Sequence, residues 1–186
     1  SGSNKVIPIL LFLIGAKKKY GYNTGILAKN LYTKAIPLNK NQYAANMYYD
    51  LISDLVKEDM ELPKIQLEDI QKIAGSVLVH PGVSKMSIVK NIYKTPPETF
   101  WVELIKKLLE KGKKVFLAGG PDDDEIVKNI IIHLKNGNIL PNQNFINLYG
   151  KTINIKDLAR RIKETEIMIC SDSAPMHIGV GVGTRV

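Results

Sequence analysis

Strand-like and helix-like segments alternate through the second half of the sequence, and this alternation constrains the fold more than any other feature. Apolar runs typical of buried strands occupy residues 76–80, 114–118, 145–148 and 167–170. Amphipathic patterns with a helical period lie between the later runs, at residues 100–111, 124–134 and 155–163. Strands joined by helices of this length pair in parallel through right-handed crossovers. The second half is therefore predicted to be α/β, with a Rossmann-like doubly wound parallel sheet.

The first part of the chain has a different pattern. Residues 6–14 read VIPILLFLI, which is too short a run to span a bilayer, and we interpret it as a buried strand. An amphipathic helix is expected over residues 42–56 and a further short helix over residues 67–73. Because one strand and a few helices cannot form a sheet domain by themselves, residues 1–66 are interpreted as the end of another domain together with a linker.

Composition argues against several classes of protein. The single cysteine, Cys170, excludes an internal disulfide framework, and with only His80, His133 and His177 as histidines a metal site is not expected. The formal net charge is +8, and all but three of the 26 basic residues are lysines spread along the chain. This pattern indicates a generic solvated surface, so no nucleic-acid partner is predicted, while an anionic partner stays open.

Glycine and polar residues follow each strand of the second half. These segments are HPGVSK at 80–85, AGGPDDDE at 118–125, NLYGKT at 147–152 and SDSAPMH at 171–177. Ligands of open α/β sheets bind at the carboxyl ends of strands, where glycine permits a close approach to the backbone. At the last segment a strand runs directly into a helix, whose N-terminus presents unpaired N–H groups and the positive end of a dipole. The sequence therefore predicts an anion site, such as a phosphate site, at this edge.

Each of these loops also has a simpler structural interpretation. His80 alone is more typical of a packed or capping histidine than of a catalyst, and the acidic residues 122–125 suit the first turn of a helix. The glycines Gly119 and Gly120 lack the GxGxxG spacing, which disfavours a nicotinamide dehydrogenase. We favour a ligand site because several such loops share one edge of the predicted sheet.

Four motifs of the chain resemble those of glycosyltransferase family 9, the ADP-heptose:lipopolysaccharide heptosyltransferases and their relatives, and they follow one another in the same order. The motifs are HPGVS at 80–84, LAGGP at 117–121, LYGKT at 148–152 and SDSAPMH at 171–177. The resemblance implies the GT-B arrangement of two facing Rossmann domains. Residues 67–186 would then be the nucleotide-sugar donor-binding domain, truncated at its C-terminus. Residues 1–66 would be the C-terminal remnant of the acceptor-binding domain and a linker.

The family resemblance implies an inverting glycosyltransferase that moves a sugar, typically heptose from ADP-heptose, to the lipopolysaccharide core. An acidic base of the acceptor domain deprotonates the acceptor hydroxyl, while the donor domain stabilises the departing nucleotide diphosphate. No metal or other cofactor is implied. The base is expected in a segment that this chain does not contain, so the chain alone is predicted to be inactive. The resemblance also implies a cytoplasmic location, and a basic surface would suit peripheral contact with the inner membrane.

Residues of the last motif receive donor-binding roles by this resemblance. The N–H groups of Ser173 and Ala174 would face the diphosphate, Asp172 would meet sugar hydroxyls or orient the loop, and His177 would lie close by. The family often has glycine where this chain has Ala174, a small change that should still allow the diphosphate to approach.

Further donor contacts are expected from the loop after the first strand of the second half. The family usually has Lys-x-Trp-Pro before the next helix, and residues 94–97 read KTPP, so the tryptophan is missing. Lys94 is the first choice for the lysine that contacts phosphate, Lys90 is the fallback, and Ser84 could also reach phosphate.

The two remaining loops would contact the nucleoside. Gly150, Lys151 and Thr152 match the family loop that flanks the base, and Asp122 and Asp124 lie near where the ribose could sit. Two alternative functions stay open. One is another GT-B transferase or an epimerase that uses a UDP-sugar, and the other is a noncatalytic nucleotide-binding module.

Overall fold

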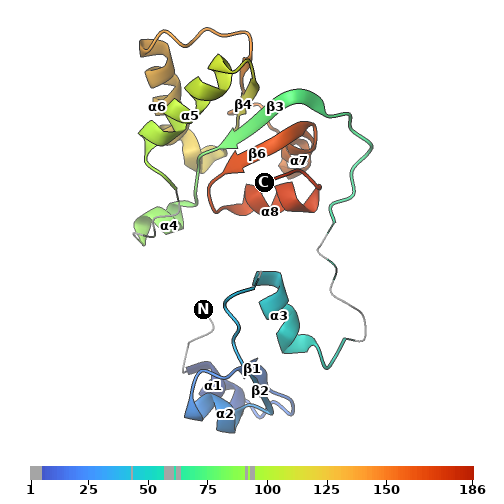
Figure 1. Cartoon of the computed structure of the whole chain (residues 1–186). Coiled ribbons are helices and arrows are strands. Elements are labelled where there is room, and N and C mark those ends of the chain that lie inside the picture. Colours follow the sequence, from blue (N-terminus) through green and yellow to red (C-terminus); the bar gives the residue numbers. More distant parts are fainter. Residues whose placement is uncertain (1–5, 43, 57–60, 62–63, 91, 93–94) are drawn as a thin grey trace. The chain divides into compact units, whose positions relative to one another are not determined.

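The computed structural model describes residues 6–42, 44–56, 61, 64–90, 92 and 95–186. Contacts within the chain divide it into two compact units, Ser1–Leu62 and Pro63–Val186. Each unit has its own strands and helices (Figure 1). Among the described residues, no helix is long and apolar enough to cross a membrane.

A parallel sheet with strand order β5-β4-β3-β6 forms the centre of the second unit. Its strands are β3 (Ile73–His80), β4 (Lys114–Leu117), β5 (Phe145–Asn147) and β6 (Thr165–Cys170). The chain moves outward from β3 through β4 to β5, and then returns to the other side of β3 with β6. This reversal creates a topological switch point at the carboxyl end of β3, where ligands of such sheets bind. The predicted doubly wound parallel sheet is confirmed.

Helices cover both faces of this sheet (Figure 1). The longer helices are α5 (Glu98–Glu110), α6 (Asp124–Asn136), α7 (Ile155–Lys163) and α8 (Ala174–Gly181), and short turns α4 (Lys85–Val89) and η1 (Pro121–Asp123) follow β3 and β4. Successive strand residues point to opposite faces. Val77 and Val79 accordingly pack with α5 and α6, whereas Leu78 packs in a second core that includes Ile162 of α7.

A buried tryptophan ties α5 to the end of β3. Trp101 is 1% exposed, and its Nε1–H donates to Thr95 Oγ1 at 3.1 Å. The Thr95 hydroxyl donates in turn to the carbonyl oxygen of Pro81 at 2.9 Å, and the Ser171 hydroxyl donates to the same oxygen at 2.7 Å. Because Pro81 follows β3 and Ser171 follows β6, these bonds fix the two strand ends relative to each other.

Two predictions for the first part of the chain are wrong. Residues 6–14 were predicted to be a buried strand, but they contain a helix, α1 (Val6–Leu13), most of whose side chains are exposed. A continuous apolar run of this length is compatible with both structures, and Pro8 is tolerated near the start of a helix because the first N–H groups there have no intrahelical partner. The predicted helix at residues 42–56 exists as α3 (Ala44–Ile52).

The remaining elements of the first unit form a small βαβ arrangement. Strands β1 (Tyr20–Tyr22) and β2 (Lys34–Ile36) pair in parallel, and α2 (Ile26–Leu31) connects them. The sheet has two strands, so the unit has little regular structure with which to form a core of its own.

The second wrong prediction is the helix at residues 67–73. Residues 64–72 have no regular secondary structure, and Ile73 already begins β3. Lysine side chains hold this segment against the rest of the second unit: Lys163 Nζ donates to the Glu68 carbonyl oxygen at 2.9 Å, and Lys72 Nζ donates to that of Thr165 at 2.7 Å. Tertiary hydrogen bonds therefore replace the helical ones that the sequence pattern suggests.

Candidate functional site

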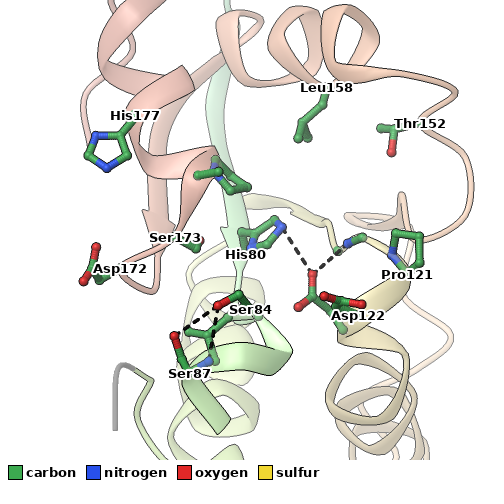
Figure 2. Close-up of a pocket in the computed structure, with 17 residues that line it drawn as sticks. His80, Ser84, Ser87, Pro121, Asp122, Thr152, Leu158, Asp172, Ser173 and His177 are labelled. Carbon is green, nitrogen blue, oxygen red and sulfur yellow. Dashed lines mark hydrogen bonds and ion pairs between the residues drawn. The ribbon is translucent and has the colours of Figure 1, made fainter. Parts of the chain in front are cut away.

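A cleft of about 570 Å³ lies at the carboxyl ends of β3, β4 and β6 (Figure 2). It is lined by His80, Gly82, Val83, Ser84, Ser87, Gly119, Gly120, Pro121, Asp122, Asp123, Thr152, Leu158, Asp172, Ser173, Ala174, Pro175 and His177. Its volume is within the range of small-molecule sites, and its position is the switch point of the sheet. The cleft is therefore the candidate ligand site of this unit.

The N-terminus of α8 forms one wall of the cleft. Ser173 is the N-cap residue, but its hydroxyl donates to the carbonyl oxygen of Ser171 at 3.3 Å and does not cap the helix. Asp172, Ser173 and Ala174 all line the cleft. Since the first N–H groups of a helix lack intrahelical partners and carry partial positive charge, this wall favours an anionic ligand group.

The opposite side is built by the loops after β3 and β4. The hydroxyls of Ser84 and Ser87 are 3.1 Å apart at the start of α4. Lys85 Nζ lies 3.3 Å from Asp122 Oδ1, which joins the two loops by an ion pair. Both side chains of this pair are more than half exposed, so solvent screens the interaction and its contribution to stability is small.

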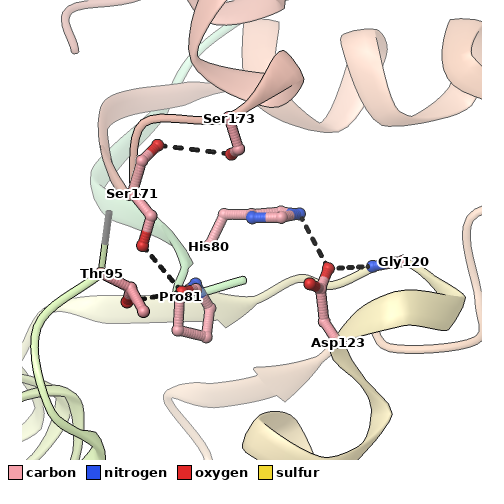
Figure 3. A network of polar contacts seen from close by, with 7 residues as sticks. All are labelled: His80, Pro81, Thr95, Gly120, Asp123, Ser171 and Ser173. Carbon is pink, nitrogen blue, oxygen red and sulfur yellow. Dashed lines mark hydrogen bonds and ion pairs between the residues drawn. The ribbon is translucent and has the colours of Figure 1, made fainter. Parts of the chain in front are cut away.

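A buried histidine and a buried aspartate lie deep in the cleft (Figure 3). His80 Nε2 is 3.6 Å from Asp123 Oδ2, and the side chains are 5% and 7% exposed. The Gly120 N–H donates to Asp123 Oδ2 at 2.7 Å. Burial lowers the pKa of His80 below its usual value, although the Asp123 carboxylate acts in the opposite direction. The imidazole is therefore neutral at physiological pH.

The charge of the lining requires an explanation if the ligand is an anion. Asp122, Asp123 and Asp172 line the cleft, and its described lining contains no lysine or arginine. Positive potential comes from the α8 N-terminus and from Lys85, which lies against Asp122.

Within the part of the chain that the structure describes, no cluster of histidine, cysteine and carboxylate side chains is placed to hold a metal ion.

Cys170 ends β6 beside this site, and its surroundings do not activate its thiol. Burial raises the pKa of its thiol, and the negative charge of Asp172 raises it further. A protonated, half-buried thiol is a weak nucleophile.

The structure brings most of the predicted donor-binding residues into one cleft. Those that line it are Ser84, Asp122, Thr152, Asp172, Ser173, Ala174 and His177. Figure 2 shows Asp172, Ser173 and His177 on one side and Asp122 on the other. Lys90, Gly150 and Lys151 are exposed and do not line the cleft. Lys94 lies outside the described residues.

Asp124, a predicted ribose contact, does not line the cleft either. Its carboxylate accepts hydrogen bonds from Tyr149 Oη at 2.6 Å and from Lys128 Nζ at 2.9 Å. The bond from Tyr149 is the main cause that lowers the pKa of Asp124, and the bond from Lys128 lowers it further. The carboxylate thus connects α6 to the loop after β5.

The sequence interpretation missed Asp123, the buried carboxylate of the cleft. A signal for it existed, because an aspartate three residues after Gly120, with proline between them, matches the pattern of a capped turn.

A doubly wound sheet with a cleft at its switch point and a helix N-terminus in the cleft wall defines a Rossmann-like ligand-binding domain. The profile of glycosyltransferase family 9 (heptosyltransferase) matches residues 8–186, and the chain belongs to this family. No curated protein matches the sequence.

Solved structures share the fold of this chain. The chain is similar to Escherichia coli ADP-heptose LPS heptosyltransferase II, with 17% identity and a TM-score of 0.59 over 98% of this chain and 58% of that one. It is also similar to a family 9 glycosyl transferase from Veillonella parvula, with 20% identity and a TM-score of 0.60 over 97% and 53%. For E. coli heptosyltransferase WaaC with ADP, the identity is 18% and the TM-score 0.53 over 83% and 47%. The chain spans about half the length of these structures.

Proposed function

We propose that the cleft binds a nucleotide-sugar donor, ADP-heptose, and that the parent protein transfers the sugar with inversion to the lipopolysaccharide core. Residues 67–186 act as the donor-binding domain in this proposal, and residues 1–66 as the end of the acceptor-binding domain. The observation that carries the proposal is the α8 N-terminus in the cleft wall, at the switch point of a family 9 chain. Two neighbouring structures contain ADP and an ADP-heptose analogue, which supports the choice of donor.

In this proposal the donor diphosphate lies against the N–H groups of Ser173 and Ala174. During transfer, negative charge accumulates on the diphosphate as the glycosidic bond to it breaks. Fixed N–H dipoles at the helix start stabilise that charge without reorganising, and this lowers the barrier. We further propose that Ser84 donates to a phosphate oxygen, Asp122 accepts from a ribose hydroxyl and Thr152 flanks the base, since all three line the cleft.

Transfer also requires a base that accepts the proton of the acceptor hydroxyl. The proposal places this carboxylate in the part of the acceptor domain that the chain does not contain. We therefore expect no turnover when the 186-residue chain is incubated with ADP-heptose and a deacylated core acceptor. Sugar transfer by this chain alone would refute that part of the proposal.

Thermal unfolding in the presence of ADP, UDP and GDP tests the choice of nucleotide. A ligand at about 100 times its Kd stabilises the folded state by about 2.7 kcal/mol, which for a domain of this size raises Tm by roughly 8 °C. ADP is expected to produce this shift and the other two nucleotides to produce much less. A larger shift with UDP would favour a UDP-sugar enzyme, and no shift with any nucleotide would refute nucleotide binding.

A charge substitution tests the helix N-terminus itself. Ala174→Glu places a carboxylate in the first turn of α8, where it suits the helix dipole but repels a diphosphate. We expect unchanged or higher Tm without ligand and loss of the ADP shift. Lys156→Glu makes a similar change in the first turn of α7, outside the cleft, and should leave the ADP shift unaltered. Equal ADP shifts in both variants would contradict the placement of the diphosphate.

We further propose a cytoplasmic location with peripheral contact to the inner membrane. Phe12 and Leu13 of α1 are exposed, and the exposed Lys17 and Lys18 follow shortly after them. Apolar and basic groups together bind anionic bilayers. Co-sedimentation with vesicles that contain anionic lipid should exceed that with zwitterionic vesicles, and Lys17→Glu with Lys18→Glu should abolish the difference.

A further inference from the structure

The His80 ring is a buried polar group that makes no side-chain hydrogen bond of ordinary length among the described residues. Its side chain is 5% exposed, and Nδ1 is buried without a hydrogen-bond partner among the described residues. Nε2 faces Asp123 Oδ2 at 3.6 Å, beyond the usual length of a hydrogen bond. Since buried polar atoms are paired in nearly all native structures, this exception needs a reason.

Stability does not provide that reason. Burial keeps the imidazole neutral, so the ring has one N–H and one acceptor nitrogen. The nearby carboxylate favours the tautomer with the proton on Nε2, which leaves Nδ1 as an acceptor with no donor. An apolar side chain of similar size would avoid this cost, so the ring makes the fold less stable than it could be.

The position of the ring suggests what it does instead. Asp123 is held on one side by the Gly120 N–H and on another by Gly82, where an added Cβ would lie 1.8 Å from Asp123 Oδ1. His80 Nε2 faces the remaining side of the same Oδ2 atom that Gly120 contacts (Figure 3). Ring and carboxylate both line the donor cleft.

We propose that His80 is a positioning residue of the cleft: its Nε2–H sets the orientation of the Asp123 carboxylate, and through it the Gly119–Gly120 turn that faces the ligand. The inference rests on the proposed nucleotide-sugar function. His80 acts through Asp123 and forms no bond to the donor. A residue with this role lowers the stability of the fold and raises the affinity for the ligand, and the two quantities can be measured separately.

Replacement of His80 by leucine tests both effects, on stability and on ligand affinity. In the 186-residue chain, His80→Leu is expected to raise Tm by about 3 °C, because it removes an unpaired buried polar group. The same change should weaken ADP binding, measured by titration calorimetry, by about fivefold, the order expected for a polar contact to a carboxylate that is longer than a hydrogen bond. A ring that only packs predicts the reverse pattern, a lower Tm with unchanged affinity.

Two further variants and one spectrum complete the experiment. His80→Gln keeps an N–H donor and should retain ADP affinity within about threefold. His133→Leu is the matched control, because His133 is exposed, pairs with Glu98 at 3.0 Å and does not line the cleft. Its ADP affinity should equal that of the wild type. The imidazole ¹⁵N shifts of His80 should show the proton on Nε2, and a proton on Nδ1 would refute the proposed orientation.

The outcomes separate this inference from the proposed function. If the wild type binds no ADP, both fall together. If the wild type binds ADP and His80→Leu binds it equally well, the positioning role alone is refuted and the donor site stands.

Discussion

Replacing Gly82 by alanine should disrupt the cleft more than any other single-methyl change in it. Gly82 is buried in the loop after β3, and an added Cβ would lie 1.8 Å from Asp123 Oδ1 and 2.0 Å from Asp123 Cγ. Atoms cannot approach this closely, so either the loop or the carboxylate must move. Asp123 is itself buried at the start of α6, which leaves little room for a shift.

The magnitude follows from two contributions. Overpacking of a filled interior costs about 1–3 kcal/mol. Movement of the carboxylate also loses the 2.7 Å hydrogen bond that the Gly120 N–H donates to Asp123, and a bond to a charged group contributes about 1.5–3 kcal/mol. We therefore expect Gly82→Ala to lower the free energy of unfolding by about 3 kcal/mol, a large share of the roughly 5–15 kcal/mol that stabilises a typical domain.

Urea denaturation followed by circular dichroism measures this loss. With an m-value of about 2 kcal/mol/M, the midpoint should fall by about 1.5 M. Gly120→Ala is the matched control, because its Cβ would lie 3.7 Å from Asp123 Oδ2, an ordinary contact, and its φ is −90°. Its midpoint should move much less.

A double variant examines the cause. In the background of Asp123→Ala the clash is absent, so adding Gly82→Ala should cost at least 1 kcal/mol less than it does in the wild type, on the order of the coupling between residues in contact. Equal losses for Gly82→Ala and Gly120→Ala, or additive losses in the double variant, would refute the reasoning.

Three further predictions concern the same unit. Asp122→Asn should weaken ADP binding about fivefold, the loss of roughly one hydrogen bond. Asp124→Asn should leave the ADP affinity unchanged, because the Asp124 carboxylate is bound by Tyr149 and Lys128 outside the cleft. Titration calorimetry of both variants compares the two affinities. Trp101→Phe removes the donor to Thr95 and should lower the free energy of unfolding by about 1–3 kcal/mol, and an unchanged urea midpoint would contradict this. Burial lowers the pKa of His80 in the folded state, so the unfolded chain takes up the proton first as the pH falls below about 6.5. The contribution of His80 to the free energy of unfolding is therefore fully present above that pH and declines below it. Urea midpoints at pH 7.5 and 5.5 should differ less in His80→Leu than in the wild type.

The periodicity of apolar residues was sufficient to predict those strands and helices whose packing follows directly from it. The strands that became β3, β4, β5 and β6 and the helices between them were predictable, because a segment buried on both faces needs apolar residues throughout and a covering helix needs only one apolar stripe. Residues 6–14 were not predictable in this way. An all-apolar run carries no period, and its helical state depends on the surrounding structure.

The position of the candidate site was also predictable, whereas the roles of individual residues in it were not. Parallel strands place their carboxyl ends at one edge, so the loops at 80–85, 118–125 and 171–177 had to meet there. Their side-chain directions depend on turns whose geometry is set by contacts distant in sequence.

The three adjacent aspartates after β4 show this division most clearly. By itself, the sequence determined that a doubly wound sheet would gather glycine, carboxylate and a helix N-terminus at one edge. Only the tertiary structure decided that Asp123 turns inward to His80, that Asp122 meets Lys85, and that Asp124 binds Tyr149. The physical reason is that successive residues of the η1 turn and of the first turn of α6 point roughly 100–120° apart, so each aspartate meets a different part of the fold, and the contacts available there are set by segments distant in sequence.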